Sequence, residues 1–123
     1  MSQITQEVAL TNVRFYAPIG YYAEERLLGN EFFVDVAVRF PFQNPDAEQL
    51  SNTINYEGLF AILSRVMKRE RLLLESAAEE ILSVARDCYS FAVEIDVMIR
   101  KTTPPFGKDH AHSSVKLHYR KQL

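Results

Sequence analysis

Lys101 is the residue whose type and position in this sequence most directly suggest chemistry. Apolar and polar residues alternate over 93–99, as in a β-strand with one buried face, and Lys101 follows in phase with the apolar set. The Thr-Thr-Pro-Pro run at 102–105 should then stop sheet pairing. A lysine directed inward at a strand end is costly unless it meets a partner or a ligand. Lys101 is therefore a candidate functional ammonium, and the alternative is a lysine that snorkels at the rim of the sheet.

Glu75 and Tyr56 stand at the starts of two expected helices. The helix dipole favours a carboxylate in the first turn, so Glu75 is either an acid that meets a ligand or an ordinary residue of a helix start. Tyr56, taken alone, is typical of an aromatic side chain that packs against a core.

The elements that hold these residues follow from the spacing of the apolar side chains, because strands and helices have different periods. The expected elements are two strands, two helices and two further strands, at residues 8–15, 32–40, 56–67, 74–85, 93–101 and 115–119. This β-β-α-α-β-β order predicts an α+β domain in which two helices cover one face of a four-stranded, mainly antiparallel sheet. Open sheet edges are hazards unless paired, so we expect the sheets of neighbouring subunits to join.

Three local features add detail to this plan. The first strand loses its alternation at Thr11-Asn12, which indicates a β-bulge. Asn55 is an expected N-cap of the first helix. The polar segment 17–30, which contains Gly20 and Gly29, is too long for a tight hairpin turn and is a candidate functional loop.

The bulk properties exclude several classes of protein. A length of 123 residues fits one domain over residues 1–123, and a net charge of −2 offers no basic surface for nucleic acid. Cys88 is the only cysteine, which excludes an intramolecular disulfide and multi-thiolate metal sites, and we expect it to be a buried structural thiol. The N-terminus lacks a signal-peptide pattern and no apolar run reaches the ~18 residues of a membrane span. We therefore expect a cytoplasmic protein without membrane contact.

Four segments together resemble the dihydroneopterin aldolase family, and the resemblance runs from about residue 8 to 120. They are GYYAEERLLGN at 20–30 leading into FFVDVAV, NTINY at 52–56, LLESAAE at 73–79, and IRK at 99–101 with Pro104-Pro105. The resemblance implies the tunnelling fold, in which β-β-α-α-β-β subunits join into a ring-shaped barrel with active sites between neighbours. Rings of this family commonly stack in pairs as octamers. It also implies an aldehyde-lyase that acts on a small pterin without a metal or another cofactor.

The resemblance also assigns roles to residues of this sequence. Lys101 and Tyr56 become the acid-base residues, Glu75 the carboxylate that anchors the pterin, and Glu25 the loop carboxylate at the reacting end. Glu24 competes with Glu25, which we prefer because its distance from the two loop glycines matches the family loop. The other expected substrate-binding residues are Leu74, Ile54 and Tyr22.

The chemistry of a pterin accounts for these residue types. Its 2-amino group and N3–H are adjacent donors that one carboxylate, such as Glu75, can accept together. Retro-aldol cleavage needs the 2'-hydroxyl deprotonated while the electrons of the C1'–C2' bond flow into the C6=N5 imine, so the substrate supplies its own electron sink. The protein must supply a base, a cation near the imine and an acid for C1'. Lys101, acting through water organised by Glu25, suits the first two tasks and Tyr56 the third.

Two alternatives share this fold and substrate class. The related epimerase inverts C2' of dihydroneopterin or its triphosphate, and clustering of Lys68, Arg69 and Arg71 would favour a triphosphate, although the net charge of −2 and the Thr-Thr-Pro-Pro run favour the aldolase. A ring protein that binds pterin without turnover is disfavoured by the joint presence of the four proposed residues. Ile19, where many relatives carry His, and Asn30, where Gln is usual, depart from the family pattern without touching its proton chemistry.

A zinc site is the third alternative, because His110-Ala-His112 has ligand-like spacing and zinc-dependent pyruvoyl-tetrahydropterin synthases share this type of fold. However, the segment DHAHSS is typical of a loop, and His118 falls on the polar face of its strand. We expect a solvated histidine loop and no metal.

Overall fold

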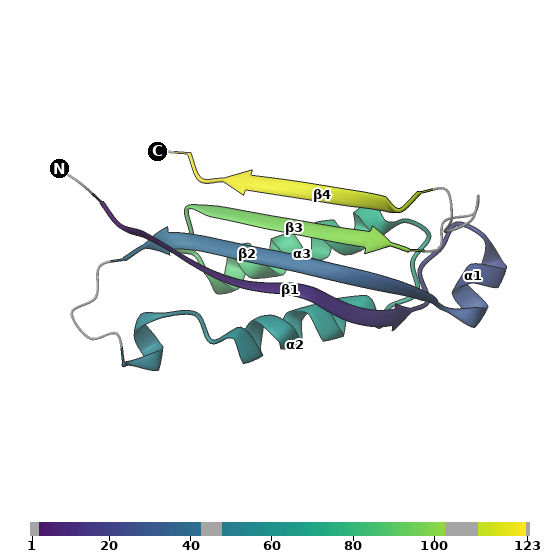
Figure 1. Ribbon diagram of the computed structural model, residues 1–123, viewed down its shortest axis with the longest axis horizontal. Helices are drawn as coiled ribbons and strands as arrows, with labels where there is room; N and C mark the ends of the chain where they lie inside the picture. The colour runs from purple at the N-terminus through teal and green to yellow at the C-terminus, as the bar shows by residue number, and fades with distance from the viewer. Residues whose placement is uncertain (1–2, 43–47, 103–110, 123) are drawn as a thin grey trace.

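The computed structural model describes residues 3–42, 48–102 and 111–122 and confirms the predicted order of strands and helices. The elements are β1 (Thr5–Ala17), α1 (Ala23–Leu28), β2 (Asn30–Pro41), the short 3-10 helix η1 (Leu50–Asn52), α2 (Tyr56–Met67), α3 (Leu74–Cys88), β3 (Glu94–Lys101) and β4 (Ser113–Arg120). The strands form one antiparallel sheet in the order β1-β2-β3-β4, and α2 and α3 lie on one face of it (Figure 1). β1 and β4 are therefore the two edge strands.

One difference from the sequence prediction is α1, a six-residue helix inside the segment that was expected to be a loop. Its residues, AEERLL, are good helix formers, and Gly29 ends the helix with a positive φ of 78° that favours glycine. The interpretation as a loop rested on the two flanking glycines and on a polar segment too long for a tight hairpin turn.

Two local predictions are confirmed. The pairing of β1 with β2 shifts register between Leu10 and Val13, and Asn12 has a φ of 56° within this bulge. The Asn55 side chain accepts a hydrogen bond from the backbone N–H of Glu57, as an N-cap should.

The prediction that Cys88 is a buried structural thiol is wrong. Cys88 is exposed although it is in phase with Ile81 and Ala85, because it is the last residue of α3 and lies beyond the last buried residue of that helix.

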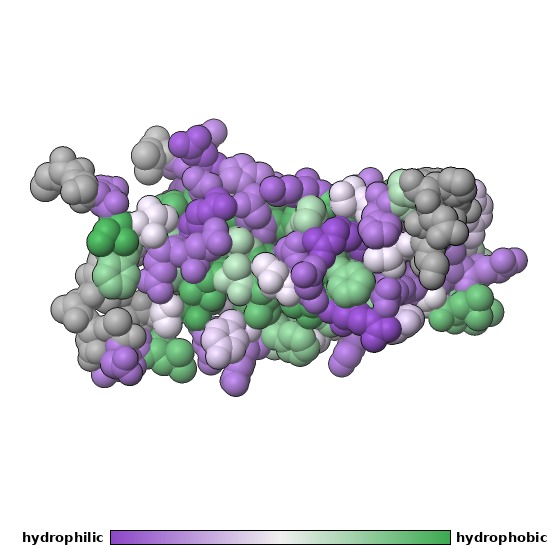
Figure 2. All heavy atoms as spheres, in the orientation of Figure 1, coloured by the Kyte–Doolittle hydropathy of each residue, from purple (hydrophilic) through white to green (hydrophobic). Residues whose placement is uncertain are grey.

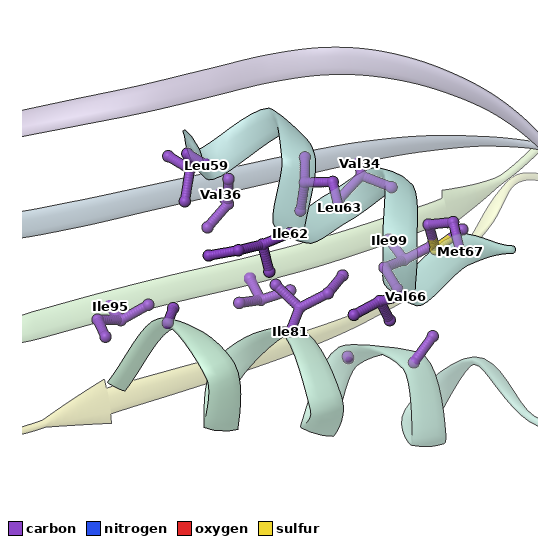
Figure 3. Close-up of a cluster of buried hydrophobic side chains, with 14 of the residues drawn as sticks. Val34, Val36, Leu59, Ile62, Leu63, Val66, Met67, Ile81, Ile95 and Ile99 are labelled. Atoms are coloured by element: carbon purple, nitrogen blue, oxygen red, sulfur yellow. The ribbon is translucent and has the colours of Figure 1, made fainter. Parts of the chain in front are cut away.

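The core lies between the sheet and the two helices (Figure 3). Alternate residues of β2 and β3 enter it, and α2 and α3 supply the facing side chains at helical spacing. The fully buried members include Val34, Val36, Leu59, Leu63, Val66, Ile81, Ile95 and Ile99. This layer fixes the directions of the strands and helices. The end of β3 and the start of α3 are consequently held close together at one edge of the core.

The opposite face of the sheet is hydrophilic, as Figure 2 shows over much of its area. Arg39 bridges Glu7, Glu94 and Asp96 across three strands, and Arg100 pairs with Asp35. No helix in the described part of the chain is long and apolar enough to span a membrane.

Candidate active site

A pocket of about 230 Å³ opens where β3 ends and α3 begins. Four parts of the chain line it: the segment from Ile19 to Glu25, Phe32 of β2, the segment from Leu72 to Glu75, and the facing ends of β3 and β4. A larger hollow of about 360 Å³ near the far end of α3 is lined by residues such as Arg86 and Tyr119, and it contains no predicted site residue. The smaller pocket is therefore the candidate site.

Lys101 and Glu25 meet in this pocket although they are far apart in the sequence. Lys101 is 8% exposed, and its Nζ donates to Glu25 Oε1 over 2.5 Å. The expected inward direction of Lys101 is thus confirmed, and its cost is offset by a carboxylate partner rather than by snorkelling to the rim. The competing carboxylate, Glu24, is exposed on the outer side of α1.

Glu25 is held in place by the start of α1. Its other carboxylate oxygen, Oε2, accepts a hydrogen bond from the backbone N–H of Tyr22 over 3.2 Å, so the carboxylate caps the helix and faces Lys101 at once. Burial of the carboxyl would raise the pKa of Glu25. The hydrogen bonds from Lys101 and Tyr22, together with the positive charges of Lys101 and Arg26, outweigh burial and lower this pKa. Glu25 is consequently an ionised carboxylate at neutral pH.

Gly20 makes room for this carboxylate. A Cβ on Gly20 would lie 2.5 Å from Glu25 Cβ and 2.7 Å from Glu25 Oε2, closer than real Cβ contacts. Arg26 also fixes the loop, since its guanidinium donates to the carbonyl oxygens of Gly20 and Tyr21 over 2.9 and 2.8 Å. Position 20 must therefore be glycine for the Glu25 side chain to occupy its place in the pocket.

Glu75 lies on the wall opposite the loop, in the first turn of α3. Its side chain is exposed, and Leu74 beside it is partly buried. Tyr22, another predicted substrate-binding residue, also lines the pocket and is 63% exposed. Buried Ile19 and Phe32 complete an apolar wall. The pocket thus combines an apolar lining with two carboxylates, Glu25 and Glu75, and with the ammonium of Lys101 at the end of β3.

Tyr56 and Ile54 are not brought to this pocket within one chain. Tyr56 is the first residue of α2 and is 62% exposed, whereas the pocket lies beyond the other end of that helix, next to α1 (Figure 1). Ile54 is 3% exposed and belongs to the core cluster, and it does not line the pocket. In the described chain, the proposed acid-base pair of Lys101 and Tyr56 is split between two regions.

Ser113 is a pocket residue that the sequence reasoning missed. It pairs directly with Lys101 in the β3–β4 register, so the two side chains lie on the same face of the sheet. Ser113 is partly buried, lines the pocket, and its hydroxyl makes no hydrogen bond to any described residue. The signal in the sequence was its place two residues before Val115, in phase with the buried side of the last strand.

The basic cluster and the histidines lie elsewhere. Arg69 and Arg71 both pair with Glu80, so two members of the cluster are engaged with a carboxylate of α3. His118 is exposed and contacts Asp96 over 2.6 Å. His112 is exposed just before β4, and His110 lies outside the described residues. Among the described residues, no three His, Cys, Asp or Glu side chains are grouped so as to hold a metal ion.

The two departures from the family pattern have structural roles here. Ile19 is buried in the wall of the pocket, and Asn30 donates from its side chain to the Ile19 carbonyl over 3.2 Å. Both residues thus hold the segment that leads to Gly20.

Comparisons with known proteins agree with this architecture. A family model described as dihydroneopterin aldolase matches residues 8–118. The dihydroneopterin aldolase of Streptococcus pyogenes is 26% identical over 113 residues, which cover 90% of this chain and 95% of that relative. The solved structure of E. coli dihydroneopterin aldolase in complex with neopterin matches with a TM-score of 0.80 at 15% identity, covering 93% of this chain and 98% of that chain.

A second solved structure, the Burkholderia thailendensis dihydroneopterin aldolase bound to guanine, has a TM-score of 0.75 at 15% identity and covers 96% of this chain and 93% of that chain. At these identities the two structures demonstrate a shared fold. The family match spans nearly the whole sheet and both long helices.

Proposed function

The chain belongs to the dihydroneopterin aldolase family, and we propose that it cleaves 7,8-dihydroneopterin into 6-hydroxymethyl-7,8-dihydropterin and glycolaldehyde, a step of folate biosynthesis. The observation that carries the proposal is the buried contact of Lys101 with Glu25 in a pocket whose other wall presents Glu75. The ammonium of Lys101 and the carboxylate of Glu25 match the reacting side chain of this substrate. The carboxylate of Glu75 matches its pterin ring.

Glu75 binds the pterin ring in this proposal. Its carboxylate accepts the 2-amino group and N3–H together, a pair of charge-assisted hydrogen bonds. The apolar wall of Ile19 and Phe32 contacts the faces of the ring, and Tyr22 and Leu74 border it. The ligands of the two structural neighbours support this assignment, because guanine and neopterin share the same amino-pyrimidinone edge.

Lys101 and Glu25 serve the reacting end. A water held by Lys101 and Glu25 takes the proton of the 2'-hydroxyl, the C1'–C2' bond breaks, and glycolaldehyde leaves. The electron pair of the broken bond moves through C6 to N5, where the Lys101 ammonium stabilises the developing negative charge. Protonation at C1' then gives the hydroxymethyl product. No external oxidant or reductant is consumed.

Tyr56 supplies the proton to C1' from a neighbouring subunit. Its exposure and its distance from the pocket of its own chain support this arrangement, as do the two unpaired sheet edges, β1 and β4. The exposed apolar side chains of Leu27 and Leu28 at the end of α1 support the stacking of two rings into an octamer. We place this assembly in the cytoplasm, with the pterin as its small-molecule partner.

The unphosphorylated substrate is favoured over the triphosphate of the epimerase reaction. A triphosphate needs free cations at the mouth of the pocket, whereas Arg69 and Arg71 are both engaged by Glu80. Epimerisation of C2' remains a side reaction, since recombination of the same intermediate with glycolaldehyde can restore either configuration.

The experiment is turnover of 7,8-dihydroneopterin by the purified protein under argon, with both products and the C2' epimer separated by chromatography. Lys101→Ala is the inactive comparison, and Lys116→Ala, an exposed lysine on the next strand, is its matched control. We expect hydroxymethyl-dihydropterin and glycolaldehyde in equal amounts from the wild type and from Lys116→Ala. Epimer without glycolaldehyde would make the protein an epimerase, and binding of product without turnover would make it a pterin-binding protein.

A further inference from the structure

Arg71 is a buried arginine that none of the proposed chemistry uses. It lies between α2 and α3, and its side chain is 5% exposed. The guanidinium donates to the carbonyl of Val66 over 3.2 Å, to Ser76 Oγ over 2.9 Å and to Glu80 Oε1 over 2.8 Å. One side chain thereby joins the last turn of α2 to the first two turns of α3.

The backbone of Arg71 makes a second connection, to the loop that precedes α1. Its N–H donates to the Pro18 carbonyl over 3.1 Å, and its carbonyl accepts from the N–H of Gly20 over 3.0 Å. These bonds form a short parallel bridge between Ile19 and Arg71. The segment around Arg71 is therefore fixed by the guanidinium on one side and by the loop on the other.

Both walls of the candidate site continue directly from this junction. Leu72 to Glu75 follow Arg71 in the chain, and Gly20, which Arg71 holds, lies against the Glu25 side chain. Arg71 does not line the pocket itself. It is nevertheless connected to both walls, through the chain to Glu75 and through Gly20 to Glu25.

Stability alone is a poor explanation for an ion pair between a buried Arg71 and a partly buried Glu80. Taking a guanidinium and a carboxylate out of water is costly, and replacing such a pair by apolar residues is often neutral or stabilising. The Arg71 Nε is buried without a hydrogen-bond partner in the described part of the chain, which adds to the cost. An apolar pair at 71 and 80 would fill the same space, but it would not link three segments at defined distances.

We propose that Arg71 is a positioning residue of the active site, which sets the separation between the pterin-anchoring Glu75 and the reacting pair of Lys101 and Glu25. The proposal rests on the function proposed above. Arg71 acts through the segments it holds and does not touch the substrate. Small displacements of groups that surround a reaction have large effects, and a shift of about 1 Å can cost about 100-fold in rate.

The test separates positioning from stability by removing the whole ion pair. Arg71→Met removes the buried partner of the partly buried Glu80 carboxylate and should lower the melting temperature. Arg71→Met with Glu80→Leu removes both charges and should restore it. If Arg71 positions the site, the double variant still has kcat/KM for dihydroneopterin about 10- to 100-fold below the wild type. Arg69→Met is the matched control, because Arg69 contacts the same Glu80 oxygen from an exposed position, and it should keep wild-type kcat/KM.

A measurement without substrate distinguishes failure of this proposal from failure of the proposed function. Titration of the Glu25 carboxyl by NMR should show its pKa rising toward the ordinary value in the double variant, because the contact with Lys101 is loosened. If the wild-type protein failed to cleave dihydroneopterin, the proposed function would be refuted. The titration would still show whether Arg71 holds Glu25 against Lys101, because it needs no substrate.

The proposal is overturned if the double variant regains the wild-type melting temperature together with wild-type kcat/KM and an unchanged Glu25 titration. If the double variant stays less stable, Arg71→Lys decides in the same assays. Lysine keeps the ion pair with Glu80 but lacks the planar fork that reaches Ser76 and Val66 at the same time. Wild-type kcat/KM in Arg71→Lys overturns the proposal, and a lowered kcat/KM with a raised Glu25 pKa supports it.

Discussion

Replacing Glu25 by glutamine removes one charge from the contact with Lys101 and keeps the shape of the side chain. The two side chains are 19% and 10% exposed, and the interacting atoms are 2.5 Å apart. A charge-assisted hydrogen bond of this kind contributes about 1.5 to 3 kcal/mol, and its loss leaves the ammonium buried without a counter-charge. We expect Glu25→Gln to lower the free energy of unfolding by about 2 kcal/mol at neutral pH.

The size of this loss should depend on pH in a direction set by the pKa of Glu25. The hydrogen bonds and positive charges around the carboxylate outweigh its burial, so the pKa is below its ordinary value of 4.5. A carboxyl with a lowered pKa in the folded chain stabilises the protein above the pKa of the unfolded chain and loses this effect as pH falls through the folded pKa. The difference between wild type and Glu25→Gln should therefore be full at neutral pH and shrink as pH falls below 4.5.

Urea unfolding followed by circular dichroism, at one fixed protein concentration, measures this difference. Glu24→Gln is the matched control, since Glu24 is an exposed neighbour in the same short helix, and we expect it to change the free energy of unfolding by less than about 0.5 kcal/mol. Equal stability of the two variants at neutral pH, or a difference that persists unchanged in acid, would refute the assignment of the buried ion pair.

Glu75→Gln should weaken binding of the hydroxymethyl-dihydropterin product by about 10- to 100-fold, because an amide cannot accept both pterin donors, whereas unchanged affinity in a fluorescence titration would contradict the anchoring role. Mixed Lys101→Ala and Tyr56→Phe subunits should regain activity that neither variant has alone, and a fully active monomer in light scattering would exclude shared sites. Tyr56→Phe should shift single-turnover products toward epimerised or oxidised pterins, and a wild-type product ratio by chromatography would remove Tyr56 from the mechanism. Ser113→Ala should lower kcat/KM for dihydroneopterin by about 3- to 10-fold without changing product affinity, because the Ser113 hydroxyl lies beside Lys101. If kcat/KM and product affinity fell equally, Ser113 would instead contact the pterin ring.

The secondary structure and the sheet were predictable from the sequence because they depend on local periodicity. Alternation over β2 and β3 and helical spacing over α2 and α3 identify the buried faces without knowledge of the partners. The bulge and the Asn55 cap were predictable for the same reason, since each depends on a few adjacent residues. The short helix α1 escaped detection because six residues are too few to display a period.

The exposure of Cys88 and the role of Ser113 depended on where elements end, which sequence patterns locate least well. Cys88 has the helical phase of the buried residues of α3, but it is the last residue of the helix and lies beyond the buried part of that face. Ser113 carried no unusual chemistry of its own, and only its register opposite Lys101 gives it a place in the pocket.

By itself, the sequence determined which residues face the core and that Lys101 ends a strand in phase with them. It also showed that a carboxylate begins the helix at Glu75, because these properties follow from spacing along the chain. Only the tertiary structure decided that Glu25 rather than Glu24 contacts Lys101, and that Arg71 joins the two walls of the pocket. The physical reason is that these contacts connect segments far apart in the chain, and their geometry depends on how the packed helices and the sheet bring the segments together.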